Sequence, residues 1–422
     1  MEVREASARY GVKPSYKQTE IGLIPSDWEF VRLTSVAKLE SGHTPSRRNP
    51  SYWDGPIPWV SLHDTDALDA PVLFDTAQRV SAEGLANSSA RLLPAGTVVF
   101  SRTATVGKTT ILGRPMATSQ DFANYVCGPR VHNRFLVYLF RSMTAEWKKL
   151  MAGSIHNTVY MPVFKELRVP LPPSHEQRAI ADALSDADAF IESLEQLLAK
   201  KRQIKQGAMQ ELLTGKKRLP GFDGKWERKP LGDLGRWSGG MTPSMQNQTY
   251  WYPATVPWIS SGDVKVIKLA ATAHSVSDQA VKLGATTLVP AESLIVVVRS
   301  GILRKYLPVA ITTVPMAINQ DIKALMPNGV CSPDFLLQAL TYLGGDILSR
   351  CLKSGTTVES LEFSWLRAFN IDVPPLPEQT AIAAVLSGMD TEIVELESKL
   401  TKAREVKQGM MQELLTGRIR LL

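Results

Sequence analysis

The chain has 422 residues, of which 44% are hydrophobic, so it is long enough for two or more domains and too apolar for wholesale disorder. No apolar run reaches membrane-spanning length and the first residues are polar, which predicts a cytoplasmic protein with no membrane association. The net charge of +7 favours a polyanionic partner, and three cysteines without CxxC spacing argue against a disulfide framework or a zinc site.

Residues 1–20 form a polar tail, and residues 21–174 carry the signals of a globular domain. GTVVFSR and ELRVPLP are short apolar runs bounded by Gly and Pro, which predicts strands, and NRFLVYLFRSMTAEWKKLM has the periodicity of an amphipathic helix. Residues 220–376 repeat these signals in SLIVVVR and PDFLLQALTYLGGDILSRCL. The sequence therefore predicts an α+β protein with two similar mixed domains.

Long helices are predicted over residues 175–219 and 377–422, because apolar residues recur in steps of three and four. Gly215 and Gly417 follow the last periodic residues as helix stops, and Ser174 with Gln177 suggests a capping box. Neither apolar seam can stay in water, so we expect the helices to pack antiparallel as a coiled coil; two separate dimerisation helices are the alternative. The seam residues are Ile180, Leu184, Ile191, Leu194, Leu198, Ile382, Leu386, Ile393, Leu396 and Leu400.

An internal duplication organises the whole chain. Residues 176–219 match residues 378–421 without a gap at 26 of 44 positions. The globular segments correspond more loosely, as in SGHTPS with SGGMTPS and MATSQD with MAINQD. This pattern indicates that the helices share one task while the two globular domains perform different ones.

Catalytic motifs are missing from the sequence. The Gly-Lys-Thr of TATVGKTT lacks the earlier glycine of a phosphate loop, since Arg102 stands at that position. No GxGxxG, HExxH or Asp/Asn-Pro-Pro-aromatic motif is present either. We therefore expect no catalytic, metal or cofactor site; a free-standing nuclease or methyltransferase and a structural coiled-coil scaffold are the alternatives.

Basic and amide side chains suggest nucleic-acid binding, because Lys and Arg neutralise phosphates, Arg pairs with guanine, and Asn or Gln pairs with adenine. The basic groups after each helix, residues 216–218 and 418–420, are also expected to face phosphates. For any one of these residues taken alone, an ordinary solvated surface is the favoured interpretation. The candidate DNA-binding residues are Arg47, Arg48, Asn49, His63, Arg102, Lys108, Asn157, Gln246, Asn247, Gln248, Arg299, Arg304 and Lys305.

The paired motifs EQRAIADALS…MQELLTGKKRL and EQTAIAAVLS…MQELLTGRIRL resemble the two repeats of the specificity subunit of type I restriction-modification systems. The resemblance extends over nearly the whole chain and implies that each globular domain is a target recognition domain for one half of a split site in double-stranded DNA. It further implies that the helix pair sets the gap between the halves and docks two modification subunits, which methylate adenine at N6. S-adenosylmethionine, ATP and Mg²⁺ are then expected only on the modification and restriction (translocase) subunits.

The glycine of each repeated KQG lies in the interior of a predicted helix, where it costs about 1 kcal/mol relative to alanine. Close approach of another backbone would explain it, and an inherited kink is the alternative. The candidate docking residues for a modification subunit are Gly207, Met209, Leu212, Gly409, Met411 and Leu414.

Overall fold

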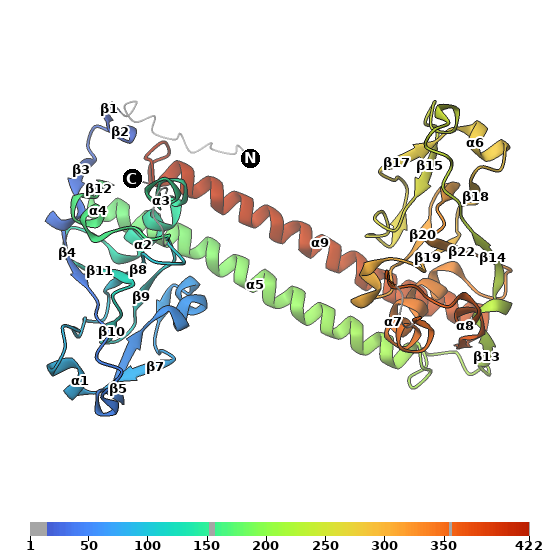
Figure 1. Ribbon diagram of the computed structural model, residues 1–422, viewed down its shortest axis with the longest axis horizontal. Helices are drawn as coiled ribbons and strands as arrows, with labels where there is room; N and C mark the ends of the chain where they lie inside the picture. The colour runs from blue at the N-terminus through green and yellow to red at the C-terminus, as the bar shows by residue number, and fades with distance from the viewer. Residues whose placement is uncertain (1–14, 152–156, 354–356, 422) are drawn as a thin grey trace, which may run out of the picture. The chain divides into compact units, whose positions relative to one another are not determined.

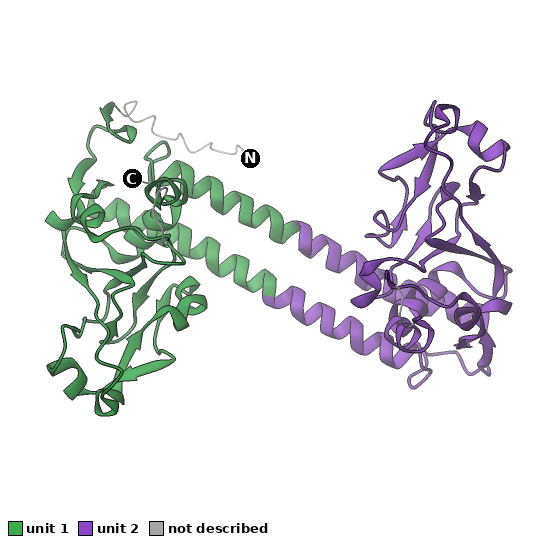
Figure 2. Cartoon of the chain, viewed as in Figure 1, with its two compact units in different colours: residues 1–195, 399–422 green, residues 196–398 purple. Residues whose placement is uncertain are grey.

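The computed structural model describes residues 15–151, 157–353 and 357–421. The chain divides into two compact units, residues 1–195 with 399–422 and residues 196–398 (Figure 2). Unit 1 and unit 2 thus each combine one globular segment with a portion of each of two long helices.

The elements follow a similar order in the two halves of the sequence (Figure 1). Those of the first half are β1 (Tyr16–Thr19), β2 (Gly22–Pro25), β3 (Glu29–Arg32), η1 (Leu33–Ser35), β4 (Ala37–Ser41), η2 (Pro50–Tyr52), β5 (Trp53–Val60), η3 (Leu62–Asp69), β6 (Val72–Leu73), β7 (Gln78–Val80), α1 (Ala82–Ala86), β8 (Val98–Ser101), β9 (Thr109–Leu112), β10 (Ala117–Thr118), β11 (Phe122–Cys127), α2 (Asn133–Ser142), α3 (Thr144–Met151), α4 (Met161–Glu166), β12 (Arg168–Leu171) and α5 (Ser174–Leu212). Those of the second half are β13 (Glu227–Pro230), η4 (Leu231–Asp233), β14 (Gly235–Gly239), η5 (Gln248–Tyr250), β15 (Val256–Ile259), β16 (Lys268–Leu269), β17 (His274–Val276), α6 (Asp278–Lys282), β18 (Thr287–Val289), β19 (Leu294–Val297), η6 (Gly301–Arg304), β20 (Val309–Thr312), β21 (Met316–Ile318), β22 (Ile322–Pro327), α7 (Pro333–Cys351), α8 (Phe363–Ala368), β23 (Asn370–Val373) and α9 (Leu376–Leu414).

A five-stranded sheet of the same order lies in each unit, β4-β11-β8-β9-β6 in unit 1 and β14-β22-β19-β20-β16 in unit 2. Strands β8, β9, β19 and β20 are buried along their whole length, which explains why they are continuous apolar or small-residue runs rather than alternating patterns. Helix α2 packs against β8 and β9, and α7 packs against β19 and β20. The prediction of two similar mixed domains is confirmed.

A smaller sheet forms the part of each unit that we call its outer lobe. In unit 1 the order is β10-β5-β7, with η2 and α1 packed on the sheet, and in unit 2 it is β17-β15-β21-β18, with η5 and α6. Trp59 pairs with Gln78 in the first lobe, and Trp258 pairs with His274 at the corresponding place in the second. The two outer lobes can therefore be compared residue by residue.

The long helices α5 and α9, of 39 residues each, are antiparallel within both units. In each unit, the residue numbers of the ion-paired side chains rise along α5 as those of their partners fall along α9. These ion pairs are Asp188–Lys407 and Glu195–Arg404 in unit 1, and Lys201–Glu392 and Lys205–Asp390 in unit 2. The predicted antiparallel pairing is confirmed, and the alternative of two separate dimerisation helices does not hold.

The predicted seam is buried mainly where the helices join the globular cores. Ile180 and Leu184 belong to the core of unit 1, and Ile382 and Leu386 to that of unit 2. Leu194, Leu198 and Leu400 are also buried, whereas Ile191, Ile393 and Leu396 are partly exposed. Among the described helices, none combines the length and the apolar composition that a membrane span needs.

The helix ends match the sequence in part. Gly215 and Gly417 have φ angles of 68° and 71°, the left-handed conformation that favours glycine after a helix. The predicted capping box is wrong, because the Gln177 side chain points elsewhere: its amide donates to the Pro172 carbonyl at 2.8 Å and its oxygen accepts from the His132 N–H at 2.7 Å.

Candidate nucleic-acid interface

A loop of common design precedes the outer lobe of each unit, at residues 42–52 and 240–250. A Cβ atom on Gly42 would lie 2.0 Å from the Ser119 carbonyl oxygen, and one on Gly240 would lie 2.1 Å from that of Ile318. Both positions therefore require glycine. Because glycine has no side chain, the loop backbone can contact the backbone of the segment just before β11 in unit 1 and just before β22 in unit 2.

Asn49 and Asn247 hold these loops from within. The Asn49 side-chain oxygen accepts from the backbone N–H and the hydroxyl of Ser51, at 3.2 and 2.9 Å. Asn247 accepts from Thr249 in the same way, at 3.1 and 2.7 Å. Both asparagines act as caps of a short 3₁₀ helix, so their oxygens are engaged in loop structure rather than available to a base edge.

A pair of tryptophans packs next to each loop. Trp53 and Trp59 pack edge to face with ring centroids 5.0 Å apart, and Trp251 and Trp258 do so at 5.5 Å. The Trp53 indole N–H also donates to the Ser46 carbonyl at 3.2 Å, and the indole of Trp251 makes the equivalent bond to Ser244. Each loop is thus fixed on both sides of the tip that it exposes.

The side chains at the two tips differ although the loops agree. Residues 46–49 are Ser-Arg-Arg-Asn in unit 1, and residues 244–247 are Ser-Met-Gln-Asn in unit 2. The Arg47 guanidinium lies 3.8 Å from the centroid of the Trp53 ring and donates to Gln78 at 2.8 Å. In unit 2 the corresponding Met245 is 72% exposed.

Arg102 connects the loop of unit 1 to its neighbours. Its guanidinium donates twice to the Gln120 carbonyl, at 2.9 and 2.6 Å, and once to that of Val159 at 3.4 Å. Gln120 in turn accepts from the Thr44 hydroxyl at 2.5 Å. Burial lowers the pKa of Arg102, although a guanidinium remains charged. Three bonds of the guanidinium are thus made to backbone carbonyls of its own domain, two to Gln120 and one to Val159.

The other candidate cations fall into two groups. Lys108 is anchored by Asp69 at 2.8 Å, and Arg304 is ion-paired with Glu359, so neither presents an uncompensated charge. Arg299, the counterpart of Arg102, is exposed and lies 4.0 Å from Asp321. The remaining candidates are exposed polar side chains: Arg48, His63, Asn157, Gln246, Gln248 and Lys305.

Two arginines expected to face phosphates have a structural role instead. Arg420 donates to the fully buried Glu176 at 2.6 and 2.8 Å, and Trp28 donates to the same carboxylate at 2.9 Å. In unit 2, Glu378 accepts from Arg218 and Trp226 in the same arrangement. The phosphate prediction is wrong for these two arginines, because a carboxylate distant in sequence already pairs with each.

Three of the predicted docking residues lie in hydrophobic cores. Met209 and Leu212 pack in the core of unit 2, and Leu414 packs in the core of unit 1. Their assignment to a partner surface is wrong, since the end of each helix closes a globular domain of this chain. Gly207, Gly409 and Met411 keep some exposure, and docking there stays a prediction.

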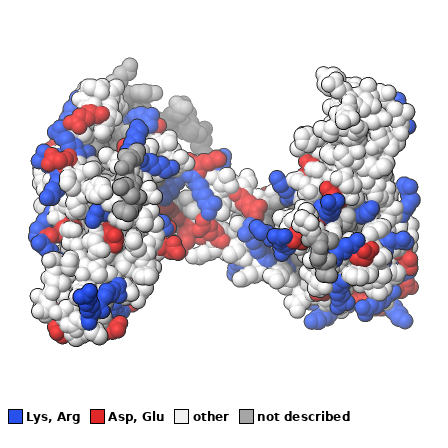
Figure 3. Space-filling model, viewed as in Figure 1, with Lys and Arg blue, Asp and Glu red and all other residues white. Residues whose placement is uncertain are grey.

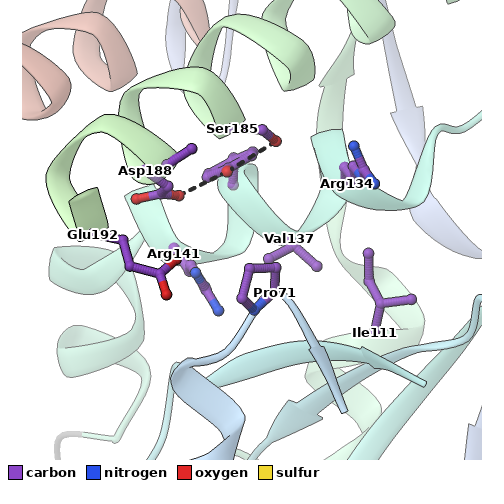
Figure 4. A pocket seen from close by; sticks show the side chains of 10 residues that line it. Pro71, Ile111, Arg134, Val137, Arg141, Ser185, Asp188 and Glu192 are labelled. Carbon is purple, nitrogen blue, oxygen red and sulfur yellow. Dashed lines mark hydrogen bonds between the residues drawn. The ribbon is translucent and has the colours of Figure 1, made fainter. Parts of the chain in front are cut away.

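A cavity of about 200 Å³ lies where α2 meets α5 in unit 1 (Figure 4). Tyr138 donates to Asp188 at 2.7 Å, and burial raises the pKa of Tyr138 to about 12. Burial also lowers the pKa of Arg141, which donates to the Thr109 carbonyl at 2.7 Å. Tyr138 and Asp188 are thus paired with each other, and Arg141 is held by backbone carbonyls. In the described part of the chain no three His, Cys, Asp or Glu side chains converge as metal ligands.

The sequence predicted some of these residues and missed others. Thr44, Gln120 and the tryptophan pairs were not singled out, although each recurs in the duplicated half as Thr242, Gln320, Trp251 and Trp258. Repetition of a polar or aromatic residue within an otherwise divergent segment was the signal that could have identified them.

Comparison with known proteins places both globular segments in one family. Residues 25–205 and 223–406 each match the type I restriction modification DNA specificity domain. Among curated proteins, the chain is similar to a type I restriction enzyme specificity subunit of Escherichia coli, with 29% identity over 65% of this chain and 67% of the relative. It is also similar to the MjaIX specificity subunit of Methanocaldococcus jannaschii, with 23% identity over 96% of both chains.

Solved structures show the same fold. The S subunit of a type I restriction-modification system from M. genitalium matches with a TM-score of 0.58 at 15% identity, covering 96% of this chain and 99% of that one. A chain from a type I restriction-modification system solved in a study of complex assembly matches with a TM-score of 0.59 at 19% identity, over 94% and 99%.

Proposed function

The chain belongs to the type I restriction-modification DNA specificity family, and from that premise we propose how its parts divide the task of sequence recognition. As a specificity subunit it recognises DNA sequence and is not itself an enzyme. Unit 1 takes one half of a bipartite site in double-stranded DNA and unit 2 takes the other. The observation that carries this proposal is the pair of matching loops, on one scaffold, with different exposed tips.

The helix pair sets the gap between the half-sites and provides docking surfaces for two modification subunits. Support comes from the duplication, because two similar surfaces on one chain suit two copies of one partner. On this proposal S-adenosylmethionine belongs to the modification subunits, which methylate adenine at N6, and ATP with Mg²⁺ belongs to restriction subunits that translocate DNA. All of these components work in the cytoplasm.

A domain exchange tests whether each unit recognises one half of the site. We expect the chain, assembled with its modification subunits, to methylate adenines in a motif of two fixed halves and a fixed gap. Replacing residues 21–174 with those of a relative of different specificity should change one half only, and replacing residues 220–376 should change the other. The readout is a map of N6-methyladenine in DNA exposed to each complex.

Three results would contradict the proposal. A change in both halves after one exchange would show that the units do not act separately. Methylation or cleavage by the purified chain alone would identify an enzyme. Binding without sequence preference, even with the partner subunits present, would indicate a structural scaffold.

A further inference from the structure

The two outer lobes differ in charge at equivalent positions. Residues 237–262, which include the whole loop of unit 2, contain no Lys, Arg, Asp or Glu. In Figure 3 the visible face of this lobe, at the upper right, is largely uncharged, whereas basic side chains gather on the lower part of unit 1. The substitutions between the lobes therefore change the chemistry that each lobe offers to DNA.

At the tip of the loop, the difference concerns two exposed positions. Arg47 and Arg48 stand where unit 2 has Met245 and Gln246. The residue that follows these two positions has the same role in both loops. The side-chain oxygens of Asn49 and Asn247 cap the same short helix and accept hydrogen bonds of 2.7–3.2 Å. Because the backbone framework is shared, these two positions can vary without disturbing the fold.

Arg47 is the more ordered of the two arginines. Its guanidinium lies on the Trp53 ring at 3.8 Å, and Gln78 accepts one of its five N–H donors at 2.8 Å. The other face of the Arg47 guanidinium and several of its N–H donors stay available for contacts with DNA, and the plane of the group is fixed. A guanidinium held in this way loses little entropy on binding and suits the bidentate contact to O6 and N7 of guanine.

Unit 2 offers a different pair of groups at this place. Met245, 72% exposed, presents only an apolar chain and a weak sulfur acceptor, which fits the C5-methyl of thymine. Gln246 carries an amide, the group that pairs with N6 and N7 of adenine. His274 stands at the strand position of Gln78, the residue that accepts from Arg47, while Trp251 keeps the place of Trp53.

We propose that Arg47 and Met245 are the specificity-determining residues at corresponding places of the two recognition domains, with Arg47 contacting a guanine of the first half-site and Met245 with Gln246 contacting an A·T pair of the second. This inference rests on the proposed function. It assigns Arg48, which lacks the stacked support of Arg47, to the phosphate backbone.

Three variants of the full chain, assembled with its modification subunits, test the inference on a library of DNA with randomised half-sites. Arg47→Met should lower the preference for guanine at one position of the first half-site by about tenfold to a hundredfold and leave the second half-site unchanged. Met245→Arg should create a guanine preference in the second half-site only. Arg48→Gln should weaken binding of all sequences alike and reduce the salt dependence by about one phosphate contact.

The unaltered half-site reports correct folding and assembly inside each experiment. If the wild-type complex shows a bipartite motif and Arg47→Met leaves its first half unchanged, the inference is overturned while the proposed function stands. A uniform loss of affinity for Arg47→Met, with a lower salt dependence, would also overturn it by making Arg47 a phosphate contact. A wild-type complex without sequence preference would refute the proposed function itself.

Discussion

At the scale of single residues, each of the buried carboxylates Glu176 and Glu378 links its own helix to two other parts of the chain by hydrogen bonds. Glu176 lies at the start of α5 and is fully buried, Trp28 belongs to the segment that opens the domain, and Arg420 follows the end of α9. A buried carboxylate left without its cation is costly, because desolvation is no longer offset by the ion pair. The arginine is therefore more important than its place in a basic tail suggests.

We predict that Arg420→Met lowers the free energy of unfolding by about 3 kcal/mol, since it leaves Glu176 buried and without its cation. Arg418→Met is the matched control: this exposed neighbour pairs with Glu413 at 3.3 Å near the end of α9, and its loss should have little effect. Urea unfolding followed by tryptophan fluorescence measures both. The double variant with Glu176→Gln should recover part of the loss, and an Arg420→Met chain as stable as the control would refute this account.

At the scale of the helices, the repeated interior glycines have no structural requirement within the chain. A Cβ atom on Gly207 or Gly409 would meet nothing within 4 Å. The sequence left two explanations open: close approach of another backbone, or an inherited kink. The described residues of this chain bring no backbone close to either glycine. The backbone of a partner subunit or an inherited kink therefore remains as the explanation.

Gly207→Ala is expected to stabilise the free chain by about 0.5–1 kcal/mol, because alanine restricts the unfolded backbone and no neighbour opposes its methyl group. It should also weaken assembly with the modification subunits if docking brings a backbone close. Gly388→Ala is the control, since this helical glycine is equally open but has no glycine counterpart in α5. Thermal unfolding and a co-purification assay give the two readouts; unchanged assembly with Gly207→Ala would remove Gly207 from the docking surface.

The helices were predictable because their signal is local: the spacing of apolar residues and the closing glycines are written within one stretch of sequence. The misassigned residues depend on distant partners. Arg218 was expected to face phosphate because its neighbours are basic, whereas Glu378 lies 160 residues away. Arg102 likewise bonds to carbonyl groups that only the folded strand order brings near. Sheet order and ion pairing of this kind follow from long-range packing, which residue patterns do not encode directly.

At the scale of the whole molecule, helix length and the gap between half-sites should be linked. Each helix of 39 residues is about 58 Å long at 1.5 Å per residue. Adding about four residues to both helices, after Glu195 and after Ser398, extends each by about 6 Å, close to the rise of two base pairs. We expect the methylated motif to keep its two halves and to gain a longer gap.

The same insertion in α5 alone serves as the control, because it breaks the register of the paired helices and should reduce methylation without shifting the gap. The gap is measured from the methylation map of each variant. A gap of unchanged length with both helices extended would exclude them as the element that sets it.

The end of α9 belongs to unit 1 although it is far from the rest of that unit in sequence, and this has a consequence for folding during translation. Unit 1 needs residues 399–421 to complete its core, and the ribosome makes them roughly two hundred residues after Glu195. Until then the apolar face around Ile180 and Leu184 has no covering from Leu414. A chain released early would expose that face to proteases and chaperones. The core of unit 1 is therefore complete only once the end of α9 has been made.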